Sequence, residues 1–307
     1  MSYYETFLKK IPKIKRFLDN DCSDQIYHYT KPEKLLNIVS NKTLRLSNVL
    51  FLNDKAEVSY TYRLIVDLIN ANQPLNSVLF DNVIEHFENK YKNIIDGYSE
   101  LYTQEYYTLS FSTEKDNLIL WNNYSKEKTY TGYNLGFDIN DIMCDIYKKQ
   151  YNAICGCIIY DEKKQKSIIK SILKHWNKKY ERTLRATRYT KHAKQSRLND
   201  ILLELIDMLS LVSVFFKNNK FKDEKEYRIV IVNHSQLGHL PEPTKIIEKN
   251  GLFVPYVEYK FPKRALKSIN IGPTMNENIF YTSTNRMLLN FGYDKVEVNW
   301  SKIPLRY

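Results

Sequence analysis

The chain has 307 residues, of which 43% are hydrophobic and 26% charged, a composition typical of a soluble globular protein. Its formal net charge is +11, and thirteen lysines and arginines against three acids between Asp161 and Arg197 account for almost all of it. Membrane-spanning and secreted classes are not expected, because the sequence has neither about 18 consecutive apolar residues nor a signal-peptide leader.

Strands are expected at both ends and in the middle of the chain, with helices grouped between them. Alternating patterns predict strands over 25–30, 43–49, 105–113, 131–139, 152–161, 226–232, 252–260, 266–273 and 295–307. Helical spacing predicts helices within 31–41, 51–71, 77–95, 116–125 and 163–218. Asp116 or Asn117 is expected to cap the fourth of these helices.

This order of elements predicts an α+β fold around a mostly antiparallel or mixed sheet, because strictly alternating βαβ units are absent. We expect a single domain over residues 1–307. The helical block at about 161–218 is expected to be an insertion that leaves the sheet and returns to it.

The cysteines indicate a reducing compartment. Cys155 and Cys157 are too close for a typical disulfide framework and lack histidines at zinc-ligand spacing, so we expect small buried side chains on a strand and no metal. Together with the missing leader, this predicts a cytoplasmic protein. The sequence also lacks the glycine-rich loops of Rossmann and P-loop nucleotide sites.

Basic residues recur at helical spacing in the charged block. On one helix they would form an outer stripe, opposite an apolar side that includes Ile169, Trp176 and Leu184. Such a stripe suits a phosphate-rich partner such as nucleic acid, although a solvated helix face has the same pattern. The residues of this basic stripe are Lys170, Lys174, Lys178, Arg182, Arg185 and Arg188.

Four clusters of polar and aromatic residues suggest a site. The clusters comprise His28, Tyr29 and Thr30; Ser110, Ser112, Trp121 and Tyr124; Tyr133 in "TGYNLGFD"; and Lys217, Glu224, Glu226 and Arg228. Each also has a structural interpretation, such as a hydrogen-bonded histidine or aromatic residues in the core. If one strand carried Glu224 and Glu226, both would share a face with Arg228, and an ion pair would explain them.

Taken in order, "IYHYT", "FLNDKAE", "LSFST", "LWNNYS", "YTGYNLGFD", "EKEYRI" and "INIGP" resemble a bacterial family known only as domain of unknown function 2971. The resemblance extends from about Gln25 to the C-terminus. That family looks like a distant branch of the ADP-ribosyltransferase superfamily. The resemblance implies a split sheet that holds NAD in a cleft, with a glutamate on a late strand.

The same resemblance implies roles for individual residues. Glu226 would stabilise the positive charge that develops on the NAD ribose, and Glu224 would orient or deprotonate the acceptor. We expect one of these neighbouring carboxyl groups to have a raised pKa. The expected NAD-binding residues are His28, Tyr29, Thr30, Ser110, Ser112, Trp121, Tyr124, Tyr133, Lys217 and Arg228.

The leading expectation is therefore an NAD-dependent ADP-ribosyltransferase, a bacterial toxin or phage-defence effector that modifies nucleic acid or a nucleic-acid-associated target. An NAD glycohydrolase differs only in using water as the acceptor. A second class is a nucleic-acid-binding module with a vestigial pocket. A third is a metal-dependent nuclease built on His28, Glu224 and Glu226.

Overall fold

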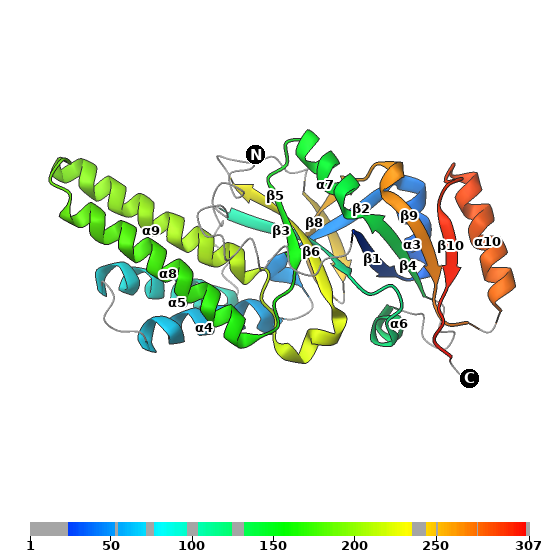
Figure 1. Cartoon of the computed structure of the whole chain (residues 1–307), viewed down its shortest axis with the longest axis horizontal. Coiled ribbons are helices and arrows are strands. Elements are labelled where there is room, and N and C mark those ends of the chain that lie inside the picture. Colours follow the sequence, from blue (N-terminus) through cyan, green and yellow to red (C-terminus); the bar gives the residue numbers. More distant parts are fainter. Residues whose placement is uncertain are drawn as a thin grey trace.

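The computed structural model describes residues 24–52, 55–71, 77–96, 104–124, 132–234, 244–249, 251–274 and 276–304. These residues form a mixed α/β fold around an open, mixed sheet (Figure 1). Among the described helices, none combines the length and apolar character that crossing a bilayer requires.

The ten described strands belong to one sheet, which confirms the prediction of a mixed sheet. Eight lie in the order β10 (Glu297–Trp300), β9 (Leu266–Ile271), β4 (Tyr133–Asp138), β1 (Gln25–Thr30), β3 (Gln104–Ser112), β2 (Thr43–Asn48), β8 (Leu252–Lys260) and β7 (Lys245–Lys249). The other two are β6 (Glu226–His234), which pairs with β3, and β5 (Ala153–Cys157), which pairs with β6. Only β9 and β10 pair in parallel; the other described pairs are antiparallel.

The sheet branches at β3. One edge of β3 pairs with β6 along its whole length. The other edge pairs with β2 at Tyr107 and Thr108 and with β1 only at Ser112. No described strand pairs with this edge between Thr108 and Ser112, because β1 and β2 diverge there. The branch therefore leaves a gap in the sheet beside Ser110.

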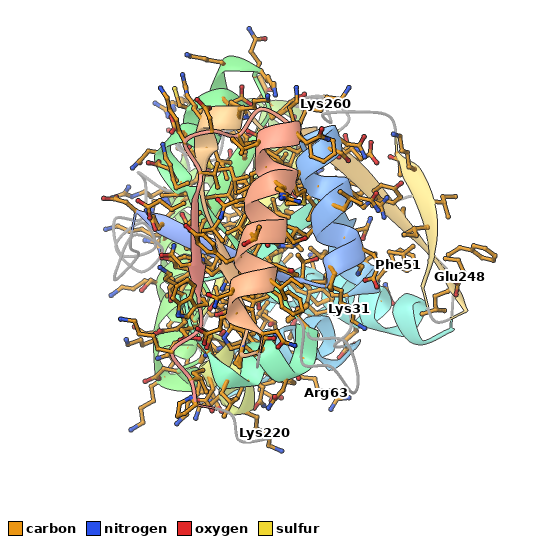
Figure 2. The ribbon with its side chains drawn as sticks, turned by 90° about the vertical axis from the view of Figure 1, so that its right-hand side faces the viewer. Lys31, Phe51, Arg63, Lys220, Glu248 and Lys260 are labelled. Carbon is orange, nitrogen blue, oxygen red and sulfur yellow. The ribbon has the colours of Figure 1, made fainter. Side chains whose placement is uncertain are left out.

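Helices cover both faces of the sheet. The first face packs on α3 (Pro32–Asn41), α7 (Ile139–Lys148) and α10 (Glu277–Asn290). The opposite face packs on α4 (Lys55–Ala71), α5 (Ser77–Asp96), α8 (Glu162–Arg185) and α9 (Lys191–Ser213). Helices α3 and α10 both cover the first face (Figure 2), and the Tyr293 hydroxyl, just after α10, donates to the Val39 carbonyl of α3 over 3.3 Å. The chain-order prediction omitted α7, α10 and β7.

The predicted helical insertion is a hairpin of two helices between β5 and β6. Helices α8 and α9 extend away from the sheet together (Figure 1). The prediction that one helix carries the whole basic stripe is wrong at its end, because α8 stops at Arg185 and the chain turns before α9. Arg188 lies in that turn. Leu184, expected on the apolar side, is 37% exposed because it lies in the last turn of α8 at the tip of the hairpin.

Candidate functional site

The candidate site forms where one face of β3 and β6 changes from apolar to polar. Side chains alternate between the two faces of a strand, so Val232, Val230, Arg228 and Glu226 share a face of β6. The two valines contribute to the core under α8 and α9, whereas Arg228 and Glu226 lie beyond it. Arg228 pairs with Ser110 and Glu226 with Ser112 on the neighbouring strand β3. The polar half of this face adjoins the gap between β1 and β2.

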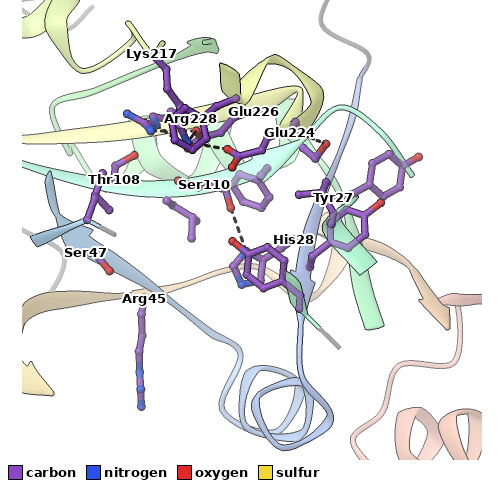
Figure 3. A pocket seen from close by; sticks show the side chains of 18 residues that line it. Tyr27, His28, Arg45, Ser47, Thr108, Ser110, Lys217, Glu224, Glu226 and Arg228 are labelled. Carbon is purple, nitrogen blue, oxygen red and sulfur yellow. Dashed lines mark hydrogen bonds and ion pairs between the residues drawn. The ribbon is translucent and has the colours of Figure 1, made fainter. Parts of the chain in front are cut away.

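A cavity of about 430 Å³ occupies this gap (Figure 3). It brings together side chains from β1, β3 and β6 that are far apart in the sequence. Nine of the predicted site residues line it: His28, Tyr29, Ser110, Ser112, Tyr124, Lys217, Glu224, Glu226 and Arg228. Its volume lies within the range of about 300–1,000 Å³ that is usual for small-molecule sites.

Three predicted site residues lie outside this cavity: Thr30, Trp121 and Tyr133. Trp121 is 1% exposed and packs edge-on against Tyr29, so it supports the cavity wall from behind. Tyr133 belongs to the core on the opposite face of the sheet. Of Tyr124 and Tyr133, both expected to bind NAD, only Tyr124 lines the cavity, where it is 42% exposed.

Glu226 is the centre of a buried ion-pair network. Its carboxylate is 7% exposed and accepts two hydrogen bonds from Arg228, Nε to Oε1 over 2.7 Å and Nη2 to Oε2 over 3.0 Å. Lys217 Nζ donates to Oε2 over 3.2 Å. Arg228 Nη1 in turn donates to the Val214 carbonyl over 2.7 Å. These contacts fix the carboxylate in one orientation at the cavity wall.

The Glu226 carboxyl remains ionised. Burial acts to raise its pKa, but the Arg228 charge and hydrogen bonds, followed by Lys217 and Ser110, lower the pKa to about 2. The expectation that paired carboxylates raise a pKa is therefore wrong for Glu226, because two cations lie beside it. At neutral pH this group supplies negative charge and hydrogen-bond acceptors, and does not act as a proton acceptor.

Glu224 does not lie on the strand, which begins at Glu226 as predicted, so the two glutamates do not share a strand face. It ends a short 3-10 helix, η2 (Asn219–Glu224), and Lys225 then turns the chain with φ of 46° before β6 begins. Lys217 Nζ bridges the two carboxylates, 2.7 Å from Glu224 Oε2 and 3.2 Å from Glu226 Oε2. An ammonium group thus occupies the position that a divalent ion would need, and this arrangement gives the nuclease hypothesis no support.

Residues that the sequence analysis missed hold this network in place. Gln165 is fully buried, and its Nε2 donates to the carbonyls of Lys217 over 3.0 Å and Ile159 over 2.6 Å. The Glu226 amide donates to the Tyr160 hydroxyl over 3.0 Å. The N-terminus of α8 and the segment between β5 and α8 therefore position Lys217 and Glu226. No sequence motif marks these contacts, because a buried glutamine in a basic helix resembles a solvated residue.

Helix α6 (Leu118–Tyr124) and η2 close the cavity from the other side. Asn117 caps α6, its Oδ1 accepting from the Ile119 amide over 3.0 Å, while its Nδ2 donates to the Asp223 carbonyl in η2 over 2.8 Å. The Ser112 hydroxyl donates to the Glu224 carbonyl over 2.9 Å. Of the two predicted caps, Asn117 is therefore the one used. The Ser112 side chain therefore lines the cavity and also forms a hydrogen bond that holds η2 against β3.

His28 spans the gap in the sheet. Its Nδ1 lies 3.1 Å from the Ser110 carbonyl, in the stretch of the β3 edge between Thr108 and Ser112 that no described strand pairs with (Figure 3). Burial lowers the pKa of this imidazole, the Ser110 hydrogen bond opposes the change and the Lys34 charge adds to it. The ring is therefore neutral at pH 7, with Nδ1–H donating to the carbonyl and Nε2 left as an acceptor.

We predict that His28 makes the protein less stable as the pH falls from 7 to 5.5. The unfolded imidazole has a pKa near 6.5, so the unfolded state gains a proton first and the stabilisation is lost below that pH. Urea unfolding of the wild type and His28→Gln across this range measures the difference. Carboxyl groups of pKa near 4 stay ionised here and cancel in the comparison. A wild type and a variant with the same slope would contradict the assignment.

Three further polar residues, which no sequence motif marks, also line the cavity. These are Arg45 and Ser47 of β2 and Thr108 of β3. Thr108 is 3% exposed, and its Oγ1 has no hydrogen-bond partner in the described part of the chain. The Arg45 side chain is 51% exposed and lies 4.0 Å from Glu258. A buried hydroxyl without a partner favours a polar ligand in this cavity.

The basic stripe lies outside this cavity, on the outer side of the helical hairpin. All six of its residues are exposed. Arg185 lies 3.4 Å from Glu181, and Arg188 packs over the Tyr189 ring. The remaining four have no acidic partner among the described residues: Lys170, Lys174, Lys178 and Arg182. The outer face of α8 is thus a row of uncompensated positive charge.

Comparison with known proteins gives one family. The model of the family described as "Protein of unknown function (DUF2971)" matches residues 120–229. The match covers most of α6, the helical hairpin and the first residues of β6, including Lys217, Glu224, Glu226 and Arg228. No curated protein and no solved structure matches the chain.

Proposed function

We propose that the protein binds NAD in the cavity beside β3 and breaks its nicotinamide–ribose bond, as an ADP-ribosyltransferase does. The observation that carries the proposal is the convergence of His28, Ser110 and Glu226 at a gap in the sheet. The resemblance to the superfamily implies this set of residues. The cavity suits the ligand chemically, because it offers an unpartnered hydroxyl, a neutral imidazole and an exposed arginine.

Glu226 would act through charge. When the glycosidic bond breaks, its electron pair leaves with nicotinamide and positive charge develops on the ribose. A carboxylate that is already ionised and held by Arg228 needs no reorganisation to stabilise that charge. A nucleophile then forms the new bond to the anomeric carbon and gives up its proton. Glu224 would accept that proton, since it is the more exposed carboxylate, at 26%.

Arg45, and not Lys217 or Arg228, would bind the pyrophosphate of NAD. Lys217 and Arg228 are both engaged with carboxylates. Arg45 lines the same cavity, and its contact with Glu258 is at the 4.0 Å limit of an ion pair. Its guanidinium can form two parallel hydrogen bonds to a phosphate.

The direct test incubates the purified chain with NAD and measures free nicotinamide. Release above the buffer rate, together with NAD binding, supports the proposal. ADP-ribose found free in solution would indicate a glycohydrolase, and ADP-ribose found covalently on an added cellular fraction would indicate a transferase. A protein that neither binds nor cleaves NAD would contradict both. The cytoplasmic role as a toxin or phage-defence effector is part of the same proposal.

A second candidate function, binding of nucleic acid, is favoured by the uncompensated charge on α8. Lysines that neutralise phosphates release counterions, so affinity falls steeply with salt. In the combined proposal, this row would hold the acceptor of the ADP-ribose.

We predict that neutralising three of these lysines weakens binding to single-stranded RNA and lowers the salt dependence of affinity. The slope of log affinity against log salt should fall by about 0.7 for each phosphate that the protein no longer neutralises. The triple variant replaces Lys170, Lys174 and Lys178 with alanine. A matched control replaces three exposed lysines on other elements, Lys42, Lys148 and Lys295. Equal effects of the two triple variants would show that net charge, and not the stripe, binds RNA.

A further inference from the structure

A second cavity, of about 720 Å³, lies on the far side of α6 from the first. Leu120 and Tyr124 of α6 line the first cavity, whereas Trp121 lines the second. The other walls come from β9, β10, α10 and the segment after β3. None of its lining residues lines the first cavity.

A row of asparagines crosses the sheet at this cavity and ends in unused hydrogen-bonding groups. Asn134, Asn270 and Asn299 are register partners on β4, β9 and β10. Asn134 Nδ2 donates to the Lys115 carbonyl over 2.7 Å, so its Oδ1 must face Asn270, whose Nδ2 donates to it over 2.5 Å. This chain of bonds fixes the orientation of the Asn270 amide and leaves Oδ1 as a free acceptor.

Asn270 is 1% exposed, and its Oδ1 has no partner in the described part of the chain. Nδ2 of the neighbouring Asn299 is also a buried atom without a hydrogen-bond partner in the described part of the chain. Both residues line the cavity. Buried polar atoms are almost always paired, so an acceptor and a donor left side by side indicate a ligand that offers a donor beside an acceptor.

The cavity also offers aromatic surface and positive charge. Trp300 is 45% exposed and Tyr281 is 40% exposed, with their rings edge to face at a centroid distance of 5.8 Å. Lys115 and Lys302 are exposed at the rim, and neither has an acidic partner among the described residues. Asp116 also lines the cavity and carries a negative charge, but its oxygens accept from Trp121 Nε1, the Ser301 hydroxyl and the Lys302 amide and pair with neither lysine, so the lining keeps a net charge of +1 from Lys115, Lys302 and Asp116.

We infer that this second cavity binds a nucleotide. Its base would pack on Trp300 and Tyr281, and the donor and acceptor on the base edge would pair with Asn270 Oδ1 and Asn299 Nδ2. The phosphate would pair with Lys115 and Lys302. Every nucleobase carries a donor beside an acceptor on its pairing edge and a face that stacks on aromatic rings, so these groups specify the class and not one base.

Asp116 links this cavity to the first. It holds Trp121, which packs edge-on against Tyr29 at 4.7 Å, and Tyr29 lines the NAD cavity. A nucleotide bound against β10 would therefore stabilise the segment that also positions α6. The site itself does not depend on the proposed activity of the first cavity.

The test is calorimetric titration of the full chain with AMP, UMP, CMP and GMP, and with a short 5′-phosphorylated single-stranded RNA. Binding of a mononucleotide would identify a free nucleotide as the ligand, and binding of the RNA alone would identify a strand end. Either result supports the inference if Trp300→Ala weakens it by about 5- to 150-fold, the loss typical of one base–aromatic stack. Lys302→Ala should also weaken binding, because each of these probes carries a phosphate.

Three control variants assign binding to this cavity. Phe253→Ala removes an exposed aromatic residue from β8, and Lys295→Ala removes an exposed lysine outside the cavity; neither should change the affinity. His28→Ala alters only the first cavity and should also leave it unchanged. No binding of any probe would overturn the inference. Binding that survives Trp300→Ala and Lys302→Ala but is lost in His28→Ala would overturn it too, because the nucleotide would then occupy the NAD cavity.

Discussion

Replacing Arg228 with methionine should destabilise the folded protein by about 3–5 kcal/mol, the usual cost of leaving a buried charge without its partner. Glu226 would keep Lys217 at 3.2 Å, but it would lose both hydrogen bonds from the guanidinium while staying 7% exposed. Removing both charges in Arg228→Met with Glu226→Leu should recover most of the loss, since an apolar pair needs no compensation. Urea unfolding of the two single variants and the double variant at pH 7 measures this coupling.

An exposed pair gives the matched control. Arg185 lies 3.4 Å from Glu181 on α8 with 83% of its side chain exposed, and Arg185→Met should change the unfolding free energy by less than about 1 kcal/mol. Acid provides a second check. Because the Glu226 pKa falls from 4.5 to about 2 on folding, its contribution is complete above pH 4.5 and is lost as the pH falls toward 2. If Arg228→Met changed the free energy of unfolding only slightly, and by the same amount at every pH, the network would contribute little to the stability of the fold.

Much of the sheet could be predicted because its strands follow simple local rules. The alternation in "EYYTLSFS" and "EYRIVIV" predicts both strands, and the switch from valine to Arg228 and Glu226 on one face of β6 marks where the apolar core stops. Helix α7 was missed although Asp138 caps it and Ile139, Ile142 and Ile146 follow helical spacing. It begins directly after β4, so one strand pattern concealed its start.

The details of the site depended on contacts between distant segments. The two-residue spacing would place Glu224 and Glu226 on one face only if the strand began at Glu224. The left-handed turn at Lys225 separates them, and Lys217, brought back after α9, lies between them. No local pattern specifies which cation meets a given carboxylate. Likewise, the sequence of α6 does not specify whether Trp121 or Tyr124 faces the first cavity; in the structure Tyr124 does.

Replacing Glu226 with glutamine should slow release of nicotinamide from NAD by about 10²–10³-fold, the effect of removing one preorganised electrostatic contact with the transition state. The amide keeps the size of the side chain but loses its charge, while Arg228 and Lys217 remain beside the ribose site. Glu224→Gln should spare this step and reduce transfer to an acceptor. Single-turnover rates with saturating NAD, below the melting temperature of the least stable variant, separate the two effects.

Glu162 provides a control glutamate whose charge has no catalytic role. It pairs with Lys166 on the exposed start of α8, and Glu162→Gln should leave the rate unchanged. NAD affinity must be measured for each variant, because a loss of binding would mimic a loss of rate. If Glu226→Gln bound NAD and kept the wild-type rate, Glu226 would be only a structural ion-pair partner of Arg228. The network would then resemble a buried salt bridge that specifies the fold, and the NAD-cleaving proposal would lose its central residue.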